Sequence, residues 1–156
     1  TVELNRHIVG RPHRFTAHPG VALAIPYKDG PELLGLSVKA DGNIQHHLKL
    51  SAQHNLAITT YWRVAGPSRD PLKVSIQLLN TAGKLVAQSD TAIGGNAAPP
   101  PGWIDGEVLT SVHDITLAGI APGDYRLILV LYDGHTGARL TSQQGQTLVL
   151  GSVQVK

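Results

Sequence analysis

Three aromatic residues could bind a sugar, because an aromatic ring can stack on the apolar face of a sugar ring. Trp103 follows the proline-rich stretch 99–102, so it either stacks on a ligand or plugs the end of the fold and pins the loop, and the sequence favours the second. Tyr61 and Tyr132 lie in β-type runs, on faces that alternation leaves open to solvent. These three residues are the candidate ligand-binding residues.

Histidines and loop carboxylates are the candidate metal ligands. Two histidine groups stand out: His46 and His47 with His54, and His7 with His13 and His18. Adjacent residues of a strand point to opposite faces, and no metallohydrolase carboxylate is placed with either group. The loop aspartates lack the D-x-D-x-[DN] run of calcium loops; they are Asp70, Asp90, Asp105 and Asp133. We therefore expect no metal and no cofactor.

The sequence motifs that mark catalytic sites are absent. The chain has no Cys, no Gly-x-Ser-x-Gly elbow and no phosphate-binding glycine loop before a helix. Asp105 and Glu107 are close in sequence, but we expect both at an exposed strand start, where water keeps carboxylates ionised. His113-Asp114 with a serine is an arrangement that chance supplies. The sequence predicts that the chain is not an enzyme.

Positive charge is concentrated near the N-terminus. The formal net charge is only +2, and the excess falls on a basic, histidine-rich stretch that contains Arg6, His7, Arg11, His13, Arg14 and His18. There is no Lys/Arg run, and aromatic residues are not interleaved with the basic ones as stacking on bases requires. We expect a solvated arm or an interdomain linker, and no nucleic-acid partner.

The rest of the chain consists of short β-type runs separated by Gly, Pro, Asn and Asp. In the sandwich region β-type runs lie at 33–39, 47–51, 56–64, 72–79, 84–89, 107–117, 125–132, 139–142 and 148–155, with a long loop at 93–102; one more run, 21–25, lies in the N-terminal stretch. This spacing is typical of an all-β, antiparallel, immunoglobulin-like β-sandwich of seven to nine strands. Residues 1–31 form an N-terminal arm or edge strand, and residues 32–156 form the sandwich domain.

Two aromatic residues have predicted structural roles. Trp62 alternates with Ile58 and Val64 on the inward face of its strand, which indicates a core tryptophan packed between two sheets. Tyr125 opens a strand after Pro-Gly-Asp, as in a tyrosine corner, whose hydroxyl bonds nearby backbone.

Several short motifs follow one another in a fixed order over residues 33–155. They are LLG (33–35), LAITTYWR (56–63), VSIQLL (74–79), GKLVAQSD (83–90), WIDGEV (103–108), PGDYRL (122–127), LYD (131–133), TG (136–137) and RL (139–140). The ordered set resembles the C-terminal immunoglobulin-like β-sandwich domain of bacterial (Chloroflexus-type) polytopic mannosyltransferase-like glycosyltransferases. Three positions depart from that pattern, and they are Gln77, Asp105 and Ser111.

The resemblance implies a domain outside the cytoplasm, periplasmic or at the cell surface, with no catalytic residues and an accessory or substrate-contacting role. Its partner is then a glycan or another domain of the same polypeptide, and it meets a membrane only through an upstream region. The absence of Met and the start at Thr1 fit a processed product or fragment. The alternative is a carbohydrate-binding module that uses Trp103, Tyr61 and Tyr132.

Overall fold

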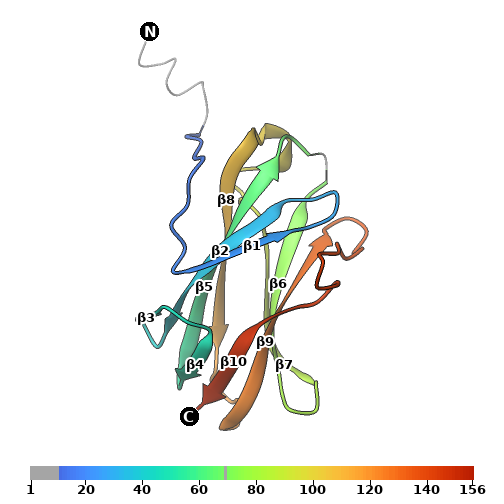
Figure 1. The fold of residues 1–156 in the computed structure, drawn as a ribbon. Coiled ribbons are helices and arrows are strands. Elements are labelled where there is room, and N and C mark those ends of the chain that lie inside the picture. The colour runs from blue at the N-terminus through green and yellow to red at the C-terminus, as the bar shows by residue number, and fades with distance from the viewer. Residues whose placement is uncertain (1–10, 69) are drawn as a thin grey trace.

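The computed structural model describes residues 11–68 and 70–156. Two five-stranded sheets pack face to face (Figure 1). The strands are β1 (Val21–Pro26), β2 (Glu32–Ala40), β3 (Asn43–Gln45), β4 (Lys49–Ala52), β5 (Asn55–Ala65), β6 (Leu72–Leu79), β7 (Leu85–Ala92), β8 (Asp105–Thr116), β9 (Gly123–Asp133) and β10 (Leu148–Val155). The one helical element in the described residues is a 3-10 turn, Pro100–Gly102.

The first sheet has the order β1-β2-β5-β8, with β3 paired to β2, and the second has the order β4-β10-β9-β6-β7. All pairs are antiparallel except β4 with β10. After β1, β2 and β3 in the first sheet, the chain crosses to the second sheet as β4, which lies beside the last strand, β10. It then returns to the first sheet as β5. The predicted immunoglobulin-like β-sandwich is confirmed.

The structure differs from the predicted strand set at two places. Residues 43–45 form β3, a short strand that was not predicted, so that ten strands are present in the described residues. Residues 139–142, predicted as a strand, form only isolated bridges, because the chain here leaves the second sheet and Thr141 accepts a hydrogen bond from Lys28 N at 2.8 Å.

The predicted role of Trp62 as a core residue is confirmed. Its side chain is fully buried, its indole N–H donates to Thr60 Oγ1 at 2.7 Å, and its ring lies 5.7 Å from that of Tyr27. Alternation along β5 buries Leu56, Ile58 and Val64 on the same face. Trp62 is thus a large packing element of the core between the two sheets.

The tyrosine corner is also present. The Tyr125 hydroxyl donates to Ala121 O at 2.6 Å, which fastens the start of β9 to the loop before it. The prediction from the Pro-Gly-Asp-Tyr motif is therefore confirmed, and it explains why this motif stands at the start of a strand.

Residues 11–20, here named the arm segment, have no regular structure and run beside the first sheet before entering β1 (Figure 1). The chain crosses closely over β2 at Gly35, where an added Cβ would lie 2.3 Å from Val21 O. Only glycine allows this approach. No helix in the described residues is long and apolar enough to cross a membrane.

Candidate functional site

Trp103 lies in the core and borders a surface hollow only with the small exposed part of its side chain. Its side chain is 4% exposed and its indole N–H donates to Ala98 O at 2.8 Å, so the ring pins the loop that contains the 3-10 turn. Stacking on a sugar needs an open ring face, which Trp103 lacks. The loop-pinning interpretation therefore describes Trp103, and its role as a sugar-stacking residue is corrected.

Tyr61 and Tyr132 lie on opposite outer faces of the sandwich. Tyr61 is on the first sheet, where its hydroxyl shares a hydrogen bond with Ser37 Oγ at 3.1 Å. Tyr132 is on the second sheet, where its hydroxyl donates to Asp90 Oδ2 at 2.7 Å. One ligand patch cannot include both rings. Alternation identified each outward face but carried no information on which sheet each strand joins.

The outer face of the second sheet carries a polar network around Tyr132. Asp90 of β7 accepts hydrogen bonds from the Tyr132 hydroxyl and, at 2.8 Å, from Ser75 Oγ of β6. Ser75 in turn accepts from Gln77 Nε2 at 3.0 Å. Burial and the neighbouring Asp90 carboxylate raise the pKa of Tyr132 to about 12, so the phenol stays protonated and donates. Three strands thus hold polar groups in fixed orientations on one surface.

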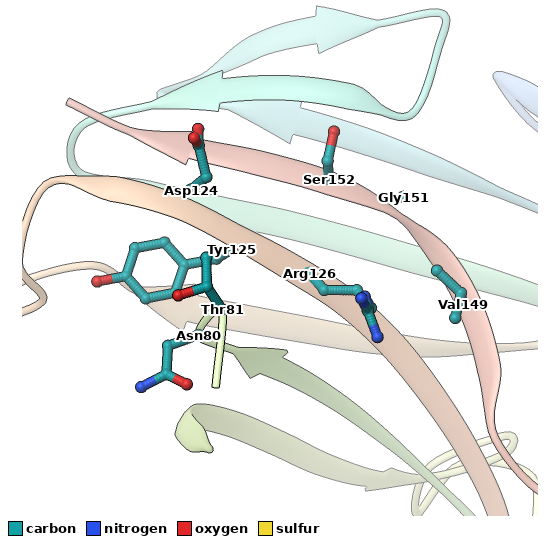
Figure 2. Close-up of a pocket in the computed structure, with 8 residues that line it drawn as sticks. All are labelled: Asn80, Thr81, Asp124, Tyr125, Arg126, Val149, Gly151 and Ser152. Atoms are coloured by element: carbon teal, nitrogen blue, oxygen red, sulfur yellow. The ribbon is translucent and has the colours of Figure 1, made fainter. Parts of the chain in front are cut away.

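A hollow of about 310 Å³ lies farther along the same face, between the β6–β7 turn and strands β9 and β10 (Figure 2). Figure 2 shows the Tyr125 ring near Asn80 and Thr81, with Arg126 on the side of Val149. The Asn80 side-chain oxygen already accepts from two backbone N–H groups, at 3.0 and 2.9 Å, which leaves its amide N–H₂ to offer to a ligand. Arg126 and Tyr132 are both outward residues of β9, roughly 20 Å apart along the strand.

A buried Ser–His pair lies between the sheets. Ser111 Oγ is 2.9 Å from His113 Nε2, and His113 Nδ1 is 3.0 Å from Ser89 O of β7. A carbonyl can only accept, so Nδ1 carries the proton and Nε2 accepts from hydroxyls. Burial lowers the pKa of His113 and keeps the ring neutral. Ser111 and His113 are 1% and 0% exposed, so this pair links β8 to β7 and is closed to a substrate.

The prediction that Asp105 and Glu107 are both exposed at the start of β8 is wrong for Glu107. Its side chain is fully buried, while Asp105 is exposed. Arg11 binds both carboxylate oxygens, with Nη2 3.0 Å from Oε1, and His13 Nδ1 lies 2.7 Å from Oε2. Arg11 above all lowers the pKa of Glu107 to about 2. The carboxylate is ionised because of this ion pair and not because of water.

The arm segment is therefore docked, which corrects the expectation of a solvated arm for residues 11–15. Besides the Glu107 contacts, Val108 N donates to Arg14 O at 2.7 Å and Arg63 Nη2 donates to Phe15 O at 3.3 Å. Sequence reading missed this site because its partners are more than ninety residues apart along the chain.

The histidine groups do not come together as a metal site in the described residues, where no cluster of three metal-binding side chains occurs. His13 contacts Glu107, and His46, His47 and His54 are exposed. His7, like Arg6, lies outside the described residues.

The fold and these contacts define an immunoglobulin-like β-sandwich domain. No protein-family model and no curated protein sequence matches the chain. Among solved structures, the chain is similar to the C-terminal domain of Wzt, with a TM-score of 0.56 and 12% sequence identity over 91% of this chain and 85% of that one. At that identity the likeness shows a shared fold.

Proposed function

We propose that this chain is a non-catalytic accessory domain, the extracytoplasmic part of a larger glycosyltransferase or cell-surface polypeptide. The observation that carries the proposal is that the groups best suited to chemistry are used to hold the fold together. His113 and Ser111 are closed within the core, and the ionised carboxylate of Glu107 is paired with the guanidinium of Arg11.

The carboxylates of the described residues also argue against acid catalysis. A general acid needs a raised pKa. Where the pKa of a carboxyl is clearly shifted, at Asp41, Glu107 and Asp133, it is lowered by hydrogen bonds that favour the ionised form. These groups stabilise turns and the arm segment. The ordered motifs of residues 33–155 support the glycosyltransferase context.

The test of this context is protease accessibility of the complete gene product in its own cells. We expect external protease to remove a tag inserted beside Lys156 from intact cells of a monoderm bacterium, or from spheroplasts of a diderm one. A cytoplasmic protein serves as the control that must survive. Protection of the tag equal to that of the control contradicts an extracytoplasmic domain.

A second candidate function, carbohydrate binding, is favoured by the network on the outer face of the second sheet. Glycans are bound by aromatic rings together with oriented polar groups that pair with hydroxyls. Tyr132, Asp90 and Gln77 supply such groups in positions fixed by mutual hydrogen bonds, which reduces the ordering cost of binding. Arg126 and Asn80 extend this surface at the hollow. Of the three candidate aromatic residues, the proposal keeps Tyr132.

Calorimetric titration with surface polysaccharide purified from the source organism tests this function. We expect Asp90→Ala and Tyr132→Ala each to weaken binding at least tenfold. Asp114→Ala, an exposed carboxylate on the first sheet, is the matched control and should bind like the wild type. Equal affinity of all four proteins, or no binding by any, contradicts glycan recognition at this face.

A further inference from the structure

The arm segment contacts the sandwich in the manner of a bound peptide. It has no regular structure, and the groups that anchor it are polar: the side chains of Arg11 and His13 and the main-chain carbonyls of Arg14 and Phe15. The Phe15 side chain is 47% exposed and most neighbouring residues are exposed as well. The segment therefore buries little apolar surface, and its docking depends on a few polar contacts.

The receptor for these contacts is built by the sandwich itself. Glu107 N donates to Ile104 O at 2.9 Å, and Ile104 N donates back to Glu107 Oε1 at 3.1 Å. Gly106 completes this tight turn with φ of 81°, a conformation that favours glycine. The Glu107 carboxylate thus accepts a hydrogen bond within its own loop in addition to those from the arm segment.

The shape of the receptor selects a guanidinium group. Arg11 reaches both oxygens of the Glu107 carboxylate and also donates from Nη2 to Gly102 O at 3.3 Å. A planar guanidinium with five N–H donors can satisfy these acceptors together. The ammonium of lysine is a point charge and cannot reproduce the bidentate contact.

The docked segment also crosses the outer face of the first sheet at Tyr61. Arg63 binds Phe15 O, and Ser37 Oγ accepts from Gly20 N at 3.1 Å. Ser37 and Arg63 lie on either side of Tyr61 on this face, and Ser37 also bonds the Tyr61 hydroxyl. In Figure 1 the chain runs beside the first sheet before it turns into β1.

We propose that Glu107, Gly102 and the free edge of β8 at Val108 form a guanidinium-specific peptide-docking site, and that residues 11–15 of this chain are its ligand. The docked segment is a strap that covers the Tyr61 face and opens when Arg11 leaves. This proposal concerns the first sheet and does not depend on glycan binding by the second.

Chymotrypsin cleavage after Phe15, the one phenylalanine of the chain, measures docking in the whole protein. Cleavage requires local release of the strap, so its rate follows the open population. We expect Glu107→Gln and Arg11→Ala each to be cut at least tenfold faster than the wild type. The cleavage rate of Arg11→Lys should lie between those of the wild type and Arg11→Ala. Arg139→Ala is the matched control, because it removes an exposed arginine outside the docking site and the strap, and its rate should stay within twofold.

Arg11→Ala keeps the result interpretable if Glu107→Gln lowers stability, because it leaves the Glu107 loop intact. Cooperative melting of each variant confirms that the sandwich is folded. Wild-type cleavage rates in both Arg11→Ala and Arg11→Lys overturn the proposal.

Binding in trans tests the specificity of the site. A fluorescent peptide of residues 11–17, RPHRFTA, is titrated into the Arg11→Ala protein and followed by anisotropy. We expect it to bind at least tenfold tighter than the same peptide with Gln in place of Arg11, and to lose that advantage when Glu107→Gln is added to the protein. Equal binding of the two peptides overturns a guanidinium-specific site.

Discussion

Replacing Trp62 by alanine tests the face assignment on which the fold rests. The side chain is fully buried, and a buried tryptophan removes about 150–250 Å² from water, worth roughly 4–6 kcal/mol at about 25 cal/mol/Å² as an upper bound. The lost N–H bond to Thr60 leaves no orphan acceptor, because Thr60 keeps Ser111 as a partner. Measured large-to-small core changes of this kind cost about 3–5 kcal/mol, and we predict a loss in that range.

Guanidinium chloride unfolding followed by far-UV circular dichroism measures this loss. Tyr61→Ala is the matched control, because Tyr61 is the preceding residue of β5 and points to the opposite face. We predict that its cost stays below about 1.5 kcal/mol, as for a partly buried residue outside the core. In a domain of this size the Trp62 variant should melt roughly 6–20 °C lower than the wild type. A cost below about 1 kcal/mol for Trp62→Ala, or a larger cost for Tyr61→Ala, refutes the assignment.

Three further predictions concern individual polar groups. Burial lowers the pKa of His113 below its ordinary value of 6.5. The contribution of the neutral ring to stability is therefore complete above pH 6.5 and is lost as pH falls toward the folded-state pKa, by up to about 1.4 kcal/mol per pH unit. Chemical unfolding at pH 7.5 and 5.5 should show this loss in the wild type and a smaller loss in His113→Asn. Tyr125→Phe removes the corner hydrogen bond and should cost about 0.5–1.5 kcal/mol in chemical unfolding, whereas an unchanged midpoint would mean that the bond contributes nothing. Asp90→Ala should lower the pKa of Tyr132 from about 12 toward 10 in an ultraviolet titration, and an unchanged titration would show that Asp90 does not act on the phenol.

Features encoded by local spacing were predictable from the sequence. The alternation around Trp62 and the Pro-Gly-Asp-Tyr motif at Tyr125 each depend on neighbours a few residues away, and both were confirmed. Period-two alternation likewise places Ser75 and Gln77 together on the outward face of β6, where their side chains share a hydrogen bond.

Features that depend on distant pairing were not predictable. Period-two alternation gives the face of a residue within its strand but not the sheet that the strand joins, so Tyr61 and Tyr132 could not be assigned to opposite surfaces. The burial of Glu107 depends on Arg11, a partner that lies 96 residues earlier in the sequence. A polar residue at a strand start is expected to be exposed until such a partner is known.

Amide chemical-shift mapping with the purified surface polysaccharide tests most directly whether the sandwich recognises a glycan. We predict that the shifted amides cluster on the outer face of the second sheet, around Asp90, Arg126 and Tyr132, and that the Tyr132→Ala protein loses them. Shifts confined to the first sheet around Tyr61, or none at saturating polysaccharide, would contradict recognition by that face.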